Sequence, residues 1–234
     1  MKKTALITGA SRGIGRNIAK ALASPGGDFD CIIMLARPSA TFDDAISDVR
    51  NRAVDCEVYA IEADLANLDS ATRIYDELDD LGVRLTTIIN NAGYTKPAAI
   101  VDTQLEDFLL TIQVNMLAPF IITKNAINRG HPVNQIINIA STAGVSGRSG
   151  WLSYSASKAA LINMSEVMRE ELSPRGIDVI CLSPGRCATD LRRILAPNED
   201  PSTIMQPDQV ASVVRLMTSE IGRLLLSQNI IVRI

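Results

Sequence analysis

Tyr154 and Lys158 are the two residues whose types and spacing point most directly to chemistry. They stand four positions apart near the start of the run 150–161, so on a helix they would lie one above the other on the same face. An ammonium beside a phenol favours the phenolate, so Lys158 should lower the pKa of Tyr154 and suit it to proton transfer with a carbonyl group. The same spacing occurs by chance in many helices, so other parts of the chain must separate a catalytic pair from a surface pair.

A glycine-rich turn near the N-terminus is the second candidate site. Residues 4–8 read as a buried strand that runs directly into TGASRGIG, and residues 16–23 then follow a helical pattern. Glycine lets the backbone turn tightly and approach a pyrophosphate, and the positive end of a helix favours the negative charge. The spacing Gly9-x-x-x-Gly13-x-Gly15 differs from the dinucleotide fingerprint Gly-x-Gly-x-x-Gly. We therefore expect a nucleotide site of a variant type.

Apolar runs of strand length alternate with longer amphipathic segments along the chain, as in repeated βαβ units. The predicted strands are 4–8, 31–36, 57–61, 85–90, 135–140, 178–183 and 229–232. The alternation predicts a single α/β domain over residues 1–234, a Rossmann-type doubly wound parallel sheet of about seven strands with helices on both faces. Ligands of such sheets bind beyond the carboxyl ends of the strands. Functional residues should therefore follow directly after strands.

Helix boundaries carry signals of their own. Thr103, with Glu106 three residues later, predicts a capping box that opens a long helix through about residue 128. Pro174 and Gly176 predict the end of the helix that carries the Tyr–Lys pair.

The composition argues against several classes of function. The chain has 234 residues, 47% of them hydrophobic and only 4% aromatic, which suits an aliphatic core around a buried parallel sheet. The formal net charge is −3, and the sequence has no runs of lysine or arginine. It therefore predicts no positively charged surface that would bind nucleic acid or an anionic membrane. The four cysteines have no metal-ligand spacing, so we expect no metal site and a cytoplasmic setting. Small molecules are the expected partners.

Six motifs in order make the chain similar to the short-chain dehydrogenases/reductases. TGASRGIG resembles the cofactor turn of that family, NNAG at 90–93 resembles the segment after its fourth strand, and Tyr-x-x-x-Lys resembles its catalytic pair. The resemblance implies catalytic roles for Asn115, Ser141, Tyr154 and Lys158. It implies cofactor contacts for Gly9, Ser11, Arg12, Gly13, Ile14, Gly15, Arg37, Asp64, Leu65, Asn91, Ala92, Gly93, Tyr154, Lys158, Pro184, Gly185 and Thr189.

The charges around the second predicted strand bear on the choice of cofactor. An acidic residue after this strand would accept hydrogen bonds from a ribose 2′-hydroxyl, whereas a 2′-phosphate needs cations. The chain has Arg37 there and a second cation, Arg12, inside the glycine-rich turn. Family members with cations at these two places generally prefer NADP, so we expect NADP(H) as the cofactor.

The resemblance also implies a mechanism for reducing a carbonyl group. Tyr154 would donate a proton to the carbonyl oxygen, and Ser141 would hydrogen-bond that oxygen where negative charge develops. Lys158 would lower the Tyr154 pKa and bind the nicotinamide ribose, and Asn115 would hold a water that links Lys158 to solvent.

The sequence also suggests roles for residues around the expected pocket and for the single histidine. Tyr94 and Trp151 flank the expected pocket and are predicted either to form its substrate wall or to pack in the core. His131, the only histidine, is expected to be a loop residue without a catalytic role. The segment 189–207 is shorter than the helical insertion that family members commonly fold over the substrate, which predicts a more open pocket.

The closest pattern within the family is that of β-ketoacyl-acyl-carrier-protein reductases. The implied substrate is a small carbonyl compound, a 3-oxoacyl thioester or another small ketone, possibly carrier-bound. Sepiapterin-type and sugar-type carbonyl reductases remain alternatives, and a catalytically silent NADP-binding sensor is an alternative from another class. A homodimer or homotetramer is expected, with Ala160, Met164, Val167 and Met168 as part of the contact surface.

Overall fold

The computed structural model describes residues 2–225 and 229–234. Its centre is a seven-stranded parallel sheet with the strand order β3-β2-β1-β4-β5-β6-β7. The strands are β1 Thr4–Thr8, β2 Cys31–Ala36, β3 Glu57–Glu62, β4 Thr87–Asn90, β5 Gln135–Ile139, β6 Asp178–Pro184 and β7 Asn229–Val232. The winding reverses between β1 and β4, since β2 and β3 lie on one side of β1 and β4 to β7 on the other. The predicted doubly wound fold is confirmed.

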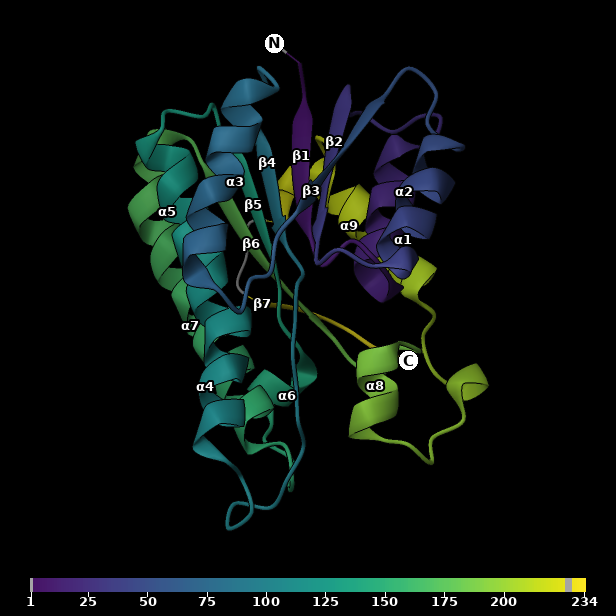
Figure 1. Cartoon of the computed structure of the whole chain (residues 1–234), viewed down its shortest axis with the longest axis vertical. Coiled ribbons are helices and arrows are strands. Elements are labelled where there is room, and N and C mark those ends of the chain that lie inside the picture. The colour runs from purple at the N-terminus through teal and green to yellow at the C-terminus, as the bar shows by residue number, and fades with distance from the viewer. Residues whose placement is uncertain (1, 226–228) are drawn as a thin grey trace.

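Helices cover both faces of the sheet (Figure 1). One layer contains α1 Gly13–Ala23, α2 Ala40–Arg50 and α9 Pro207–Thr218. The opposite layer contains α3 Leu68–Asp80, α4 Leu105–Ile112, α5 Ala118–Asn128 and α7 Leu152–Leu172. Two large apolar cores lie between the sheet and these layers, built mainly from aliphatic side chains. The two short helices α6 Thr142–Val145 and α8 Asp190–Leu195 lie at the carboxyl end of the sheet.

Strand boundaries differ from the predicted ones by at most two residues. The largest difference is at β4, which begins at Thr87 instead of residue 85. The backbone N–H of Leu85 donates to Nδ1 of His131 at 3.0 Å, so it is bonded to a side chain and not to a neighbouring strand. The apolar pattern of the strand could not reveal this contact between distant segments.

The predicted capping box at Thr103 and Glu106 is wrong. The hydroxyl of Thr103 donates to the carbonyl of Ala99 at 2.9 Å, and the helix begins after Gln104, whose side chain makes no cap. The predicted end of α7 is confirmed, because a 3-10 turn over Ser173–Arg175 leads to Gly176, which has φ +71°.

The long helix through residue 128 does not have uniform α geometry. A π-helical turn, Gln113–Leu117, lies between α4 and α5, and the N–H of Ala118 donates to the carbonyl of Gln113, five residues earlier. Pro119 explains the change locally, because it has no N–H to donate to the carbonyl of Asn115, four residues before it. The proline thus changes the helical register at the predicted catalytic asparagine.

By length and composition alone, the helical stretch Leu105–Asn128 could also cross a membrane. Core helices of water-soluble proteins pass the same test. Here the stretch belongs to a helical layer, where α5 packs against α3 and α4 packs against α7. The contacts with α3 and α7 account for part of the apolar character of the stretch Leu105–Asn128.

Candidate active site

The glycine-rich turn brings the end of β1 to the start of α1. Gly9 has φ +67° and Gly13 has φ +55°, both in the left-handed region that glycine adopts readily. A Cβ atom at Gly9 would lie 2.8 Å from the Cα of Ala92, and one at Gly15 would collide with the carbonyl of Gly9. Only glycine therefore allows this close approach of two backbone segments. The turn forms a cradle that a pyrophosphate can enter beside the N-terminus of α1.

Thr8 and Asn91 clamp this turn to the segment after β4. The Thr8 hydroxyl accepts from the backbone N–H groups of Asn91 at 3.0 Å and Ala92 at 2.9 Å. The side-chain amide of Asn91 donates to the carbonyls of Thr8 at 2.9 Å and Gly9 at 3.3 Å. Thr8 was not among the predicted site residues, although it is the first residue of the glycine-rich motif. Its contribution is to hold the cofactor turn against the central strands.

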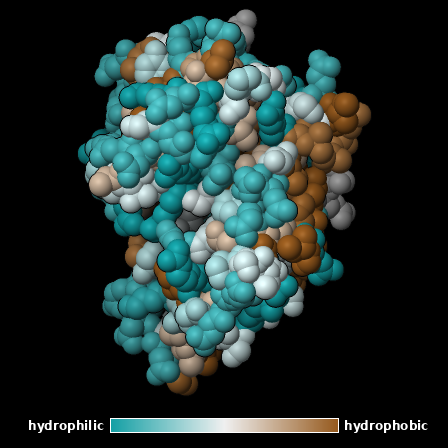
Figure 2. Space-filling model, turned by 90° about the vertical axis from the view of Figure 1, so that its right-hand side faces the viewer, coloured by the Kyte–Doolittle hydropathy of each residue, from teal (hydrophilic) through white to brown (hydrophobic). Residues whose placement is uncertain are grey.

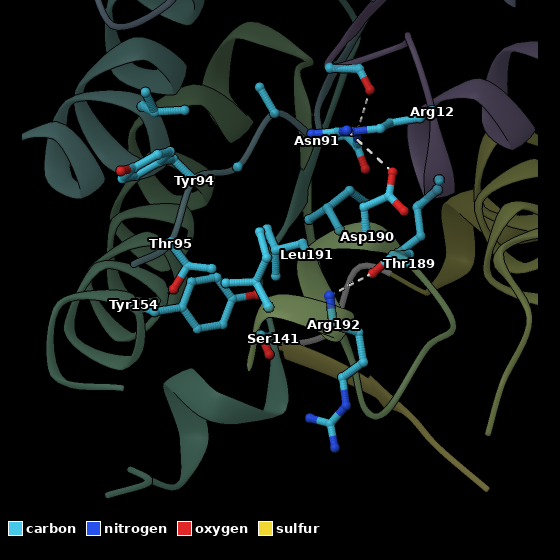
Figure 3. Close-up of a pocket in the computed structure, with 18 of the residues that line it drawn as sticks. Arg12, Asn91, Tyr94, Thr95, Ser141, Tyr154, Thr189, Asp190, Leu191 and Arg192 are labelled. Atoms are coloured by element: carbon cyan, nitrogen blue, oxygen red, sulfur yellow. Dashed lines mark hydrogen bonds and ion pairs between the residues drawn. The ribbon is translucent and has the colours of Figure 1, made fainter. Parts of the chain in front are cut away.

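The far end of the cavity carries the two predicted cations. Arg37 is exposed directly after β2, with no acidic residue beside it. Arg12 pairs with Asp190 of α8 at 3.2 Å, which links the glycine-rich turn to α8 (Figure 3). Asp64 and Leu65 follow β3, and the Asp64 carboxylate accepts from the N–H of Ala66 at 3.0 Å. This end of the cavity therefore fits an adenosine with a phosphorylated ribose.

Tyr154 lies in a largely apolar part of the cavity. Its side chain is 7% exposed and packs in a cluster with Ala143 and Leu195, and Trp151 meets it edge-on with the ring centroids 6.4 Å apart. Burial raises the pKa of Tyr154 above its usual value, while a hydrogen bond to Ser141 and the positive charge of Arg192 act in the opposite direction. The phenol is therefore held protonated at neutral pH and can act as a proton donor.

Lys158 lies one helical turn further along α7 and is also buried. Its ammonium donates to the carbonyl of Ile139 at 2.8 Å and lies 5.9 Å from the centroid of the Tyr154 ring. Burial lowers the Lys158 pKa to about 8. Burial outweighs the charges around the phenol, so the pKa of Tyr154 is raised overall, and the lowering of this pKa by Lys158 stays a prediction.

Asn115 is fully buried at the π-helical turn. Its side-chain oxygen accepts from the N–H of Tyr94 at 2.7 Å. Its amide donates to the carbonyl of Tyr94 at 3.0 Å and to the hydroxyl of Ser157 at 2.9 Å. Ser157 in turn donates to the carbonyl of Tyr154 at 2.8 Å. Asn115 therefore ties the segment after β4 to the helix that carries Tyr154 and Lys158.

One cavity of about 940 Å³ connects the glycine-rich turn to Tyr154. Among the predicted residues, only Gly15 and Asn115 do not line it, because both lie behind its wall. The predicted residues that line it are Gly9, Ser11, Arg12, Gly13, Ile14, Arg37, Asp64, Leu65, Asn91, Ala92, Gly93, Tyr94, Ser141, Trp151, Tyr154, Lys158, Pro184, Gly185 and Thr189. Figure 2, which looks at the side carrying α1, α2 and α8, shows a mostly hydrophilic face with a hollow near its middle.

The short segment 189–207 covers Tyr154 more closely than predicted. Thr189 caps α8 by accepting from the N–H of Arg192 at 3.1 Å. This places Leu191 and Leu195 against the cluster around Tyr154 (Figure 3). Two leucines on one short helix thus cover the phenol, and the more open pocket relative to family members stays a prediction.

Several residues that line the cavity were missed by sequence reasoning. They are Thr95, Leu191 and Leu195. Thr95 follows the NNAG segment by two residues, and its buried hydroxyl has no hydrogen-bond partner in the described part of the chain. Arg148, Arg186 and Arg192 also line the cavity. The sequence offers these three, with Arg129 and Arg193, as candidates for a basic patch that an acidic carrier protein would need beside the pocket mouth, but it could not bring them together, because their meeting depends on how α8 folds back over α7.

His131 is buried away from the cavity. Its ring packs edge-on against Tyr75 with centroids 5.3 Å apart, and burial lowers its pKa to about 4. The imidazole accepts the backbone hydrogen bond before β4 described above. The geometry supports a structural role for this histidine.

Known proteins are similar to this chain in sequence and in fold. The short chain dehydrogenase family model matches residues 3–200. A 3-oxoacyl-acyl-carrier-protein reductase of Synechocystis is 32% identical over 227 residues, covering 93% of this chain and 90% of the relative. Another from Aquifex aeolicus is 28% identical over 230 residues, covering 94% of this chain and 91% of the relative.

Solved structures agree with this relationship. A short chain dehydrogenase from Burkholderia cenocepacia in complex with NADP has a TM-score of 0.85 and 28% identity, covering 98% of this chain and 96% of the other. A dehydrogenase/reductase from Sinorhizobium meliloti has a TM-score of 0.84 and 28% identity, covering 98% and 93%. Together with the Tyr154–Lys158 pair and the glycine-rich turn in one cavity, these matches establish that the chain belongs to the short chain dehydrogenase family of oxidoreductases.

Proposed function

We propose that the protein is an NADPH-dependent carbonyl reductase in which Tyr154 is the general acid. The observation that carries this proposal is the single cavity that joins Tyr154, Ser141 and Lys158 to the glycine-rich turn. A binding module has no chemical need for a buried tyrosine beside a buried lysine. The cavity therefore favours an enzyme over the alternative of a silent NADP-binding sensor.

The residues at the adenosine end support NADP(H) as the cofactor. Glycines line the turn where a Cβ would block the backbone, and Arg12 and Arg37 supply positive charge where a 2′-phosphate would lie. The Burkholderia relative described above was solved with NADP, which also supports this choice. When bound, NADPH supplies the hydride that reaches the substrate's carbonyl carbon.

The side chains near Tyr154 would complete the reduction. Tyr154 donates its proton to the carbonyl oxygen, so that hydride on carbon and proton on oxygen together yield an alcohol. Ser141 hydrogen-bonds the oxygen while negative charge develops on it. Lys158 keeps a positive charge close to the phenol below about pH 8 and stabilises the phenolate that remains.

The substrate class that the relatives support is a 3-oxoacyl thioester, since reductases of that name match over most of this chain. Other small ketones, including those of sepiapterin-type and sugar-type reductases, fit the same catalytic residues. We propose that the enzyme works in the cytoplasm, which its four free cysteines support. We also propose that it forms a homodimer or a homotetramer.

Absorbance decay of NADPH tests the proposed function. The purified protein should oxidise NADPH with at least one member of a panel of acetoacetyl thioesters and small ketones, and NADH should be the poorer cofactor. Tight NADPH binding without turnover of any carbonyl compound would contradict the proposal and favour the sensor.

A further inference from the structure

Arg148 and Arg192 meet on a single indole ring beside Tyr154. The guanidinium of Arg148 lies 5.7 Å from the centroid of the Trp151 ring, and that of Arg192 lies 5.4 Å from it. Arg148 and Trp151 precede α7, whereas Arg192 belongs to α8, so two separate segments bring these cations together. An electron-rich indole attracts cations, but it does not neutralise their charge.

Only one of the two arginines has an acidic partner. Glu199 binds Arg192 through both of its oxygens, with distances of 2.5 Å to Nε and 2.7 Å to Nη2, and it also lies 3.5 Å from Arg186. Within residues 2–225 and 229–234, Arg148 makes no ion pair with any carboxylate. This end of the cavity therefore has three arginines for one glutamate.

The remaining carboxylate of this region is already engaged. Asp190 pairs with Arg12 at 3.2 Å and with Arg193 at 2.6 Å. The exposed guanidinium of Arg148 lines the cavity, so a ligand can reach it. A guanidinium binds a carboxylate through two parallel hydrogen bonds, which makes an anionic group the natural partner of Arg148.

The position of this cation relative to the reacting group limits the ligand. Trp151 touches Tyr154 edge-on and touches Arg148 with its ring, so one aromatic ring separates the guanidinium from the phenol. An anion held by Arg148 would lie across the Trp151 ring from a carbonyl group at Tyr154. A carboxylate on the substrate itself suits a separation of one aromatic ring better than the phosphate of a carrier arm, which a much longer chain separates from the carbonyl.

We infer that the substrate is a small oxo acid whose carboxylate is bound by Arg148, where the guanidinium lies over the ring of Trp151. This inference rests on the proposed carbonyl reduction and replaces the thioester by a free acid as its substrate class. Arg192 positions Trp151 and adds positive charge, and Glu199 holds Arg192 in place. Arg148 is thus a specificity-determining residue.

The test compares oxo acids with their neutral esters in the NADPH assay. Acetoacetate and levulinate are each measured beside their methyl esters, in the wild type and in Arg148→Gln, Arg148→Lys and Arg73→Gln. Arg73 is a matched control, because it is an exposed arginine of α3 outside the cavity. The wild type should prefer at least one acid over its ester by about ten- to hundred-fold in kcat/KM, the range of a charge-assisted hydrogen bond.

Arg148→Gln should reduce that ratio to about one, Arg148→Lys should restore part of it, and Arg73→Gln should keep the wild-type ratio. A purely structural role for Arg148 would lower both kcat/KM values together and leave the ratio unchanged, which would overturn the inference. Equal use of acid and ester by the wild type would also overturn it.

Two thioesters test whether the anion that Arg148 binds is a distant phosphate and not a carboxylate of the substrate. If acetoacetyl-coenzyme A is preferred over the neutral N-acetylcysteamine thioester and Arg148→Gln removes that preference, the anion is a distant phosphate and the oxo-acid inference is wrong. If NADPH binds but none of these carbonyl compounds is reduced, the proposed carbonyl reduction fails with it. Turnover of esters without any preference for acids would leave the carbonyl reductase standing and reject only the oxo acid.

Discussion

Burial raises the pKa of Tyr154 more than its neighbours Ser141 and Arg192 lower it. The ring is enclosed by Ala143, Trp151 and Leu195, and this apolar setting raises its pKa despite Ser141 and Arg192. The residues of the Tyr–Lys pair could be recognised from their spacing, because i and i+4 share a helix face. The direction of the pKa shift could not, because it depends on leucines that follow Tyr154 by about forty positions.

Lys158 should determine the alkaline limit of the reaction. Its pKa is lowered from 10.5 to about 8 by burial, whereas that of Tyr154 is raised, so Lys158 loses its charge first as the pH increases. The kcat/KM for carbonyl reduction should therefore fall as the pH rises through about 8. In Lys158→Arg, whose guanidinium stays charged, activity should be lower but this fall should move to higher pH.

A pH profile of kcat/KM from pH 6 to 10 checks this prediction. The control is Lys124→Arg on α5, at an exposed lysine outside the cavity, which should keep the fall near pH 8. An unchanged profile in Lys158→Arg would assign the fall to another group.

Arg37 should determine the preference for NADPH. It is exposed at the end of β2 and can bind a 2′-phosphate that NADH lacks. Arg37→Ala should raise the KM for NADPH by about ten-fold or more, with little change in the KM for NADH. Arg73→Ala is the control. The assignment fails if the variant keeps the wild-type preference, or if the wild type prefers NADH.

At the scale of elements, the π-helical turn shows that a sequence pattern can predict a helix without predicting a change of register within it. A long helix from Thr103 through about residue 128 was predicted from a capping signal, and the structure has helical turns over 105–128. The change of register was not predicted, although Pro119 provides its local cause by lacking the N–H that Asn115 would use. The wrong cap at Thr103 has a similar origin, since its hydroxyl prefers a nearby carbonyl in the preceding turn.

Asn115→Ala should lower both the free energy of unfolding and the kcat of carbonyl reduction. The substitution leaves the N–H and carbonyl of Tyr94 and the Ser157 hydroxyl without the bonds that Asn115 supplies. We expect the free energy of unfolding to fall by about 2–4 kcal/mol, and kcat to fall because Tyr94 and α7 lose their link. Urea denaturation and steady-state kinetics measure the two effects.

Asn125→Ala on α5 is the matched control, because that side chain is bonded only near the surface, to Thr72 at 3.3 Å. It should change the free energy of unfolding by less than about 1 kcal/mol. Equal losses in the two variants would show that the buried bonds of Asn115 do not stabilise the fold.

At the scale of the whole molecule, the predicted contact surface needs correction. Met168 lies in the core, so it cannot contribute as expected, and Met164 is partly buried against the same core. Val167 of the predicted set is exposed on α7, and Leu109 on α4 and Phe120 on α5 are further exposed apolar side chains. The apolar pattern predicted which helices lie on this side of the sheet, but it could not show which way each methionine points.

The proposed homodimer or homotetramer predicts a specific mass. Light scattering should give about two or four times the chain mass of 25.2 kDa. Leu109→Glu combined with Phe120→Glu should shift the protein to the monomer, because two buried charges would oppose association. Val54→Glu, at an exposed valine between α2 and β3, should leave the mass unchanged. A wild-type monomer would contradict the proposal.

The layers and the cavity followed from the alternation of apolar runs, since strands that run in parallel place their following residues at one edge. The cavity residues that follow the strands were therefore predictable. The packing of α8 over Tyr154 was not, and neither was the meeting of Arg148 and Arg192 on Trp151, because these arginines meet only after α8 folds over α7.

The most direct test of the central claim is NADPH oxidation by Tyr154→Phe, measured beside NADPH binding on the same preparation. The account predicts a loss of at least about 10²-fold in turnover, the lower range for a general acid, with NADPH binding retained. Turnover close to that of the wild type would contradict the assignment of Tyr154 as the proton donor.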